Sequence, residues 1–178
     1  MAEDTRIVLA GFGGQGVLFA GKVIATTGLI EDLEVSWLPS YGPEMRGGTA
    51  NCSVTLSHRS IGSPLVTNPD VLIAMNQPSF DKFIDDVEPG GIVIVDSVLV
   101  PQIKERADVT ICKIPAQKIA EDNGMKGLGN IVLVGKLFEQ IGFCSRETLD
   151  AAIDKCVPAR KQAMVALNKK ALELGMSN

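Results

Sequence analysis

The sequence predicts an α/β fold: a single domain over residues 1–178, with three layers (α/β/α) around a mixed, mostly parallel sheet. Three observations support this prediction. Short apolar segments typical of buried strands alternate with segments of helical periodicity along the chain. The first apolar segment ends in a cluster of glycines that leads directly into a helical pattern. One further segment alternates between apolar and polar residues, which indicates an antiparallel strand and an inserted β-hairpin.

The amino-terminal segment predicts a Rossmann-like βα unit. Residues 6–10 are largely apolar and partly β-branched, which suits a buried strand. Residues 17–27 carry apolar side chains at helical spacing. Between these segments, three glycines fit the pattern G-x-G-x-x-G: Gly11, Gly13 and Gly16. The helix start near Gln15 should present free N–H groups and the positive end of the helix dipole, which together favour an anion.

The other elements follow in order from the same signals. Strands are expected at residues 35–38, 49–56, 70–75, 92–96 and 109–114. A short return strand is expected to begin at residues 61–64 and to form the hairpin with the alternating segment 49–56. Helices are expected at residues 76–87, 116–122 and 131–141, then after Ser145, and finally from Pro158 to Gly175. Gly142 is the expected stop of the helix before it.

Composition excludes several classes of protein. The chain has 178 residues, of which 46% are hydrophobic and 21% charged, so we expect a globular domain with a sizeable core. A net charge of −4, no basic run and an aromatic content of 4% argue against a nucleic-acid partner. No apolar stretch is long enough to span a bilayer, and the acidic amino terminus does not resemble a signal peptide. We therefore expect a cytoplasmic protein without a membrane or nucleic-acid partner.

The cysteines do not indicate a metal site. They stand at positions 52, 112, 144 and 156, so that no two are closer than twelve residues, and the only histidine is His58. Zinc and iron–sulfur sites usually need cysteines in closely spaced pairs. The cysteines are therefore interpreted as small buried apolar side chains, and no metal ligands are expected.

The glycine motif alone leaves two interpretations open. A dinucleotide-binding protein needs an acidic residue at the end of the second strand to bind a ribose hydroxyl. Here Glu31, Asp32 and Glu34 precede that strand, at the wrong end of the sheet, which argues against NAD or FAD. Gly16 is followed by Val17 and Leu18, so an ATP-binding P-loop is also absent. The alternative is that the glycines only allow a strand and a helix to pack tightly.

A second loop, Tyr41–Gly48, follows the second strand. Arg46 offers a planar guanidinium suited to phosphate or carboxylate, and Glu44 can hold it in place. Gly47 and Gly48 would allow a close approach of another backbone. In an open α/β sheet this loop should lie at the carboxyl edge, near the glycine motif. By itself it could also be a structural turn with a surface ion pair.

The two loops together resemble the gamma subunit of 2-oxoacid:ferredoxin oxidoreductases, and the resemblance covers nearly the whole chain. The segments that carry it are Gly11–Gly16, Tyr41–Gly48, Ser63-Pro64, Asp70–Ala74, Gly90–Ser97 and Gly129-Asn130 with the helix that follows. Members of this family act on pyruvate, 2-oxoglutarate, branched-chain 2-oxoacids such as ketoisovalerate or, in a close relative, indolepyruvate. The resemblance does not select one of them.

The resemblance implies an accessory role in a multisubunit enzyme. Such a complex decarboxylates a 2-oxoacid, transfers the acyl group to coenzyme A and passes two electrons to ferredoxin. Thiamine diphosphate is implied to bind the alpha and beta subunits, and iron–sulfur clusters a delta subunit. No catalytic residue and no cofactor are assigned to this chain. The candidate residues for coenzyme A or for a subunit interface are Gly11, Gly13, Gly14, Gln15, Gly16, Glu44, Arg46, Gly47 and Gly48.

Three alternatives are kept beside this interpretation. The chain could be a stand-alone Rossmann-type oxidoreductase that binds a dinucleotide, or a subunit of an indolepyruvate ferredoxin oxidoreductase. It could also be an interaction protein without enzymatic function. A gamma subunit separated from its partners can self-associate through the surfaces that normally contact them.

Overall fold

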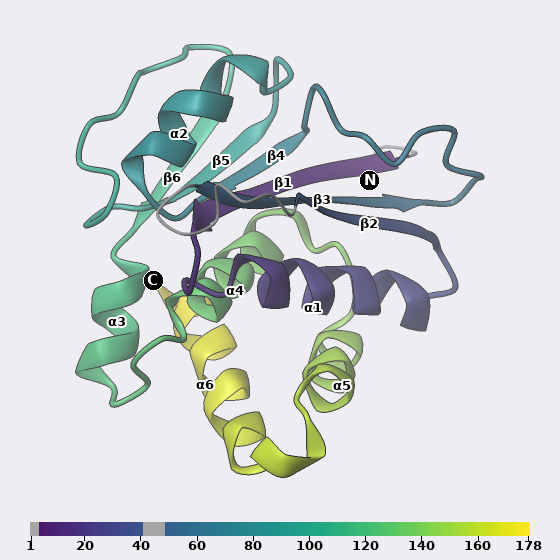
Figure 1. The fold of residues 1–178 in the computed structure, drawn as a ribbon, viewed down its shortest axis with the longest axis vertical. Coiled ribbons are helices and arrows are strands. Elements are labelled where there is room, and N and C mark those ends of the chain that lie inside the picture. Colours follow the sequence, from purple (N-terminus) through teal and green to yellow (C-terminus); the bar gives the residue numbers. More distant parts are fainter. Residues whose placement is uncertain (1–3, 41–48) are drawn as a thin grey trace.

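A computed structural model describes residues 4–40 and 49–178 of the chain (Figure 1). Its centre is a six-stranded sheet in the order β2-β3-β1-β4-β5-β6. The strands are β1 (Asp4–Phe12), β2 (Glu34–Ser40), β3 (Thr49–Ser57), β4 (Val71–Ala74), β5 (Ile92–Asp96) and β6 (Thr110–Ile114). Strands β1, β4, β5 and β6 are parallel, whereas β3 runs antiparallel to β1 and β2. The predicted α/β fold with a mixed, mostly parallel sheet is confirmed.

Helices cover the two faces of the sheet unequally (Figure 1). The helices α1 (Val17–Ile30), α3 (Ala116–Asp122), α4 (Gly129–Ile141), α5 (Arg146–Cys156) and α6 (Ala163–Ser177) contribute to the larger core. On the opposite face, α2 (Gln77–Phe83) and a 3-10 turn at Ile84–Asp86 cover a smaller core around Phe80 and Ile84. Because β4 is buried on both faces, its sequence is entirely apolar.

The antiparallel part of the sheet differs from the prediction. The expected return strand at residues 61–64 is wrong, because that segment contains no strand. Instead β3 lies between β1 and β2, with Ser40 opposite Asn51 and Gly11 opposite Ala50. Both edges of β3 are therefore already paired, which leaves no edge for a return strand. The hairpin is formed by β2 and β3.

Local capping signals identified several helix ends correctly. Asn76 Oδ1 accepts a hydrogen bond of 2.9 Å from Ser79 N at the start of α2. Ser145 Oγ accepts one of 3.0 Å from Thr148 N at the start of α5. Gly142 adopts a left-handed conformation with φ of 52° at the end of α4, as a helix-terminating glycine does.

The last helix was predicted with the wrong ends. Pro158 precedes a 3-10 turn at Ala159–Lys161, and α6 itself begins at Ala163. Gly175 does not end α6, which continues to Ser177. A Cβ atom at Gly175 would collide with the carbonyl oxygen of Val132, so this glycine allows the backbones of α6 and α4 to touch.

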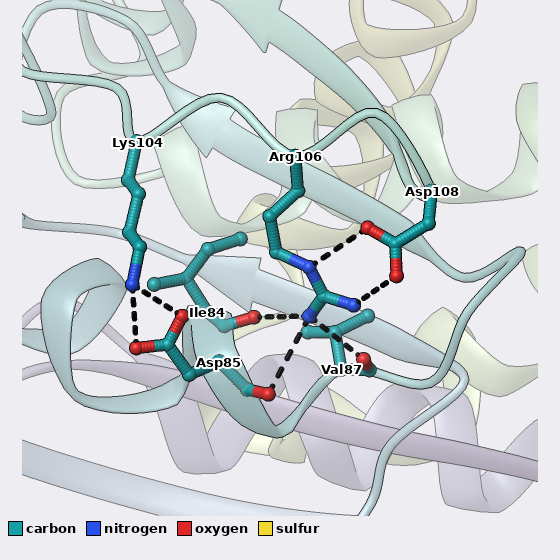
Figure 2. A network of polar contacts seen from close by, with 6 residues as sticks. All are labelled: Ile84, Asp85, Val87, Lys104, Arg106 and Asp108. Carbon is teal, nitrogen blue, oxygen red and sulfur yellow. Dashed lines mark hydrogen bonds and ion pairs between the residues drawn. The ribbon is translucent and has the colours of Figure 1, made fainter.

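A network of polar contacts joins the segment between β5 and β6 to the 3-10 turn that follows α2 (Figure 2). Arg106 Nη1 donates hydrogen bonds of 2.8 Å to the carbonyl oxygens of Ile84 and Val87. The same guanidinium pairs with both carboxylate oxygens of Asp108, which lowers the pKa of that carboxyl group. Lys104 pairs with Asp85 nearby. Arg106 thus satisfies carbonyl groups at the end of a helix, and its charge is already paired.

No helix within residues 4–40 and 49–178 combines the length and the apolar character needed to cross a membrane.

Candidate functional site

The glycine loop joins the end of β1 to the start of α1. Gly14 and Gly16 have φ angles of 95° and 76°, in the left-handed region that favours glycine. Gly13 and Gly14 are exposed, and a Cβ atom at Gly14 would meet nothing within 4 Å. Gly16 caps α1 through its backbone only, since no side chain accepts a hydrogen bond there. The uncapped start of a helix of 14 residues leaves amide donors and a positive dipole for an anion.

Gln15 has a structural role in this loop. Its Oε1 accepts hydrogen bonds from Phe12 N at 2.6 Å and from Asn76 Nδ2 at 3.2 Å. Its Nε2 donates to the carbonyl oxygen of Met75 at 3.0 Å. The side chain therefore joins the ends of β1 and β4 and holds the loop in shape.

Gly11 is required for close packing and is not accessible to a ligand. It is buried, and a Cβ atom there would lie 2.8 Å from Gln15 Oε1 and 3.0 Å from Met75 Cβ. The interpretation of tight packing therefore applies to Gly11, whereas Gly13 and Gly14 remain available to a ligand.

Asn130 belongs to this site, although the sequence analysis did not assign it a role there. Its Nδ2 donates a hydrogen bond of 3.0 Å to the carbonyl oxygen of Gly16. Its side chain also occupies the space that a Cβ atom at Gly16 would need. Asn130 is 5% exposed, and its Oδ1 has no hydrogen-bond partner among the described residues. The available signal in the sequence was a polar residue directly before the apolar run Ile131–Val134.

Asp96 supports the same edge of the sheet from the end of β5. Its carboxylate accepts hydrogen bonds from Val98 N at 3.0 Å and from Gln117 N at 2.7 Å. The side chain is 2% exposed. It therefore ties together the turn after β5 and the start of α3, and it positions the walls of the site.

The second predicted loop lies outside the described residues, and with it Glu44, Arg46, Gly47 and Gly48. The residues that flank it are described. Ser40 pairs with Asn51, and Thr49 pairs with Phe12, the last residue of β1. The register therefore brings both flanks of this loop to the edge of the sheet that carries the glycine loop.

Two grooves adjoin the glycine loop. One, of about 310 Å³, is lined by Gly14, Gln15, Leu99, Gln117, Lys126 and Gly127. The other, of about 540 Å³, has Gly16, Phe19, Leu128 and Asn130 in its walls. A third groove, of about 440 Å³, is lined by Asp4, Asp70 and Glu88, among others. Its acidic lining suits an anion poorly, so an anionic ligand fits the glycine loop better.

The geometry also argues against a dinucleotide site. In a Rossmann fold the second strand lies next to the first. Here β3 lies between β1 and β2, so the two strands are not neighbours. Glu31 lies at the far end of α1, where its carboxylate accepts hydrogen bonds from Thr148 Oγ1 at 2.6 Å and Ser145 N at 3.1 Å. These contacts lower the pKa of Glu31 and give it a structural role.

The cysteines do not form a reactive or metal-binding cluster in the part of the chain that is described. Cys52 and Cys156 are buried, and Cys112 and Cys144 are half-buried. Burial raises the pKa values of Cys52 and Cys144 to about 12, so both thiols are protonated at neutral pH. Across residues 4–40 and 49–178, no three His, Cys, Asp or Glu side chains gather as metal ligands do.

The family model and the related proteins described below point to the same family of oxidoreductases. The family described as "Pyruvate ferredoxin/flavodoxin oxidoreductase" matches residues 6–178. Ketoisovalerate oxidoreductase subunit VorA of Methanothermobacter thermautotrophicus is 40% identical over 174 residues, which are 97% of this chain and 36% of that protein. The chain thus spans about a third of VorA. 2-Oxoglutarate synthase subunit KorC of Methanocaldococcus jannaschii is 39% identical over 156 residues, which are 86% of this chain and 83% of that protein.

A solved structure is similar to this chain in both sequence and fold. The gamma subunit of a keto/oxoacid ferredoxin oxidoreductase from Geobacter sulfurreducens superimposes with a TM-score of 0.83 at 31% identity. The alignment covers 97% of this chain and 96% of that one. The resemblance predicted from the two loops is confirmed, and the chain belongs to the pyruvate ferredoxin/flavodoxin oxidoreductase family.

Proposed function

We propose that this chain is the gamma subunit of a multisubunit 2-oxoacid:ferredoxin oxidoreductase. The observation that carries this proposal is mutual coverage: this chain and the Geobacter gamma subunit match over 97% and 96% of their lengths. KorC, which is itself named as a subunit, matches over most of its length as well. The complex would oxidatively decarboxylate a 2-oxoacid to an acyl-coenzyme A and pass the electrons to ferredoxin.

The catalytic cofactors belong to the partner subunits in this proposal. Thiamine diphosphate would bind the alpha and beta subunits and supply the carbanion chemistry of decarboxylation. Iron–sulfur clusters would bind a delta subunit and carry the electrons. The thiols of Cys52 and Cys144 are protonated, and the four cysteines are widely spaced in the sequence, so they fit neither task. This chain would instead contribute subunit packing and part of the coenzyme A site.

The glycine loop is the proposed contact for the phosphates of coenzyme A. Gly13 and Gly14 are exposed, and the start of α1 has no side-chain cap. Backbone N–H groups at a helix start bind phosphate without any charged side chain. Arg46 belongs to the segment between Ser40 and Thr49, and of these two flanking residues Thr49 pairs with Phe12 and Ser40 with Asn51. A guanidinium at this edge would add a bidentate donor for the same phosphates.

Co-expression with the neighbouring candidate subunits tests the function. The complex would be purified through a tag on this chain and assayed for 2-oxoacid- and coenzyme A-dependent reduction of ferredoxin or a viologen dye. We expect activity from the complex and none from this chain alone, and a panel of 2-oxoacids would identify the substrate. Failure of any partner to copurify, together with tight dinucleotide binding by the lone chain, would contradict the proposal.

Arg46→Ala tests the phosphate contact within the assembled complex. Loss of a charge-assisted hydrogen bond to phosphate, about 1.5–3 kcal/mol, should raise KM for coenzyme A roughly tenfold or more. The KM for the 2-oxoacid should stay unchanged, because that substrate binds elsewhere. An unchanged KM for coenzyme A in a fully assembled complex would show that Arg46 makes no such contact.

A further inference from the structure

Two hydrogen bonds close the exposed turn of the glycine loop. Gln15 N donates to the carbonyl oxygen of Phe12 at 3.1 Å, and Phe12 N donates to Gln15 Oε1 at 2.6 Å. The exposed residues Gly13 and Gly14 lie between these two ends. The direction in which their backbone N–H groups point therefore depends on where the Gln15 side chain is held.

The Gln15 side chain is itself held by Asn76, the residue that caps α2. Asn76 Nδ2 donates a hydrogen bond of 3.2 Å to Gln15 Oε1, while Asn76 Oδ1 accepts one of 2.9 Å from Ser79 N. These partners fix the orientation of the Asn76 amide, because Gln15 Oε1 already accepts from Phe12 N and a backbone N–H can only donate. Asn76 thus connects the start of α2 to the glycine loop with both ends of one side chain.

Burial excludes Asn76 from direct contact with a ligand. The residue is 2% exposed, and it follows β4, whose last residue Ala74 lies beside Ala10 of β1. A buried amide whose donor and acceptor are both used stabilises one arrangement of the groups around it. Any effect of Asn76 on a ligand must therefore be transmitted through Gln15 and the exposed turn.

We propose that Asn76 is a positioning residue for the binding of coenzyme A, an inference that rests on the proposed role of the glycine loop. It holds Gln15 so that the turn at Gly13 and Gly14 has its binding conformation before the ligand arrives. Such preorganisation raises affinity, because less conformational entropy is lost on binding. Asn76 contributes to the affinity for coenzyme A and takes no part in the chemistry at the thiol.

Asn76→Asp in the assembled complex separates the two hydrogen bonds of the amide. Aspartate keeps the oxygen that accepts from Ser79 N, and it caps a helix as well as asparagine does. It replaces the Nδ2 donor by a carboxylate oxygen that faces Gln15 Oε1, so that two acceptors repel each other. We expect KM for coenzyme A to rise about tenfold, because this repulsion and the lost hydrogen bond displace the loop. The kcat and the KM for the 2-oxoacid should stay at their wild-type values.

A double-variant cycle tests whether Asn76 acts through Gln15. Gln15→Ala removes the acceptor that Asn76 contacts, so it should raise KM for coenzyme A by itself. Asn76→Asp added to Gln15→Ala should then cause little further change, because the two residues share one interaction. Ser79→Ala is the matched control in the same helical turn, since Ser79 Oγ has no hydrogen-bond partner among the described residues. This control should leave KM for coenzyme A at the wild-type value.

A wild-type KM for coenzyme A in an assembled Asn76→Asp complex would overturn the assignment, and so would independent effects of the two variants in the cycle. If Asn76→Asp does not assemble, Asn76→Ser takes its place, because serine also caps a helix but is too short to bridge both groups. Failure of both variants to assemble would mean that the fold requires Asn76, which contradicts a positioning role. A wild-type complex without coenzyme A-dependent activity would instead refute the proposed function.

Discussion

Glycines occur in two regions of this molecule for different physical reasons. Where α4 crosses α6, a Cβ atom at Gly135 would collide with the carbonyl oxygen of Leu172, and one at Gly175 with that of Val132. These glycines let two helix backbones touch. In the loop before α1, Gly14 and Gly16 have positive φ angles, and Gly14 has open space where a side chain would be.

The comparison distinguishes glycines required for packing from glycines required for their backbone conformation. A packing glycine is surrounded by other parts of the same chain, so its backbone is not accessible to a ligand. A glycine such as Gly14 adopts a positive φ angle and faces open space, so its backbone remains accessible to solvent. Gly11 belongs to the first type, although it lies in the same motif as Gly14.

The largest effect is expected from Gly135→Leu. The new side chain must push α4 and α6 apart, because it meets backbone rather than a flexible side chain. We expect a loss of about 3 kcal/mol or more in the free energy of unfolding. Urea denaturation followed by circular dichroism measures this loss. Gly62→Leu is the control, since Gly62 is exposed with no atom within 4 Å of its Cβ position, and an equal loss there would contradict the packing role.

An intermediate effect is expected from Gly11→Ala. The methyl group would press on Met75 Cβ and displace Gln15 Oε1, which accepts the Phe12 N–H. We expect a loss of about 2 kcal/mol from overpacking. Gly14→Ala meets no atom and should cost only about 1 kcal/mol through its left-handed backbone. If Gly14→Ala proved the more damaging in thermal unfolding, the division between the two glycines would be wrong.

The smallest effect is expected from Glu31→Gln at the opposite end of α1. Hydrogen bonds from Thr148 and Ser145 lower the pKa of Glu31 below its ordinary value of 4.5. A lowered folded-state pKa stabilises the protein above pH 4.5, and this stabilisation is lost as the pH falls through the folded-state pKa.

Thermal unfolding from pH 7 to pH 3 measures this contribution. The Tm of Glu31→Gln should be slightly lower than that of the wild type near pH 7, and the difference should shrink below about pH 4.5. Glu34→Gln, at an exposed position at the start of β2, is the matched control and should show no such trend. A Tm difference for Glu31→Gln that is independent of pH would mean that the carboxylate charge is not involved.

The sequence by itself determined the local elements, because their signals act between near neighbours. Asn76 and Ser145 accept hydrogen bonds from the first turns that they cap, and Gly142 supplies a left-handed helix end. The strand–glycine–helix unit was predicted for the same reason. The similarity of the two loops to a known family was also visible in the sequence, and it gave the correct family.

Only the tertiary structure decided which distant segments meet. The position of β3 between β1 and β2, and the contact of Gly175 with Val132, depend on pairing and packing across long stretches of chain. The groove that joins Gly16, Asn130 and Arg160 comes from three separate elements. Sequence periodicity reports which residues face the core, but it carries no information on which buried faces pack together, and that pairing is what creates the site.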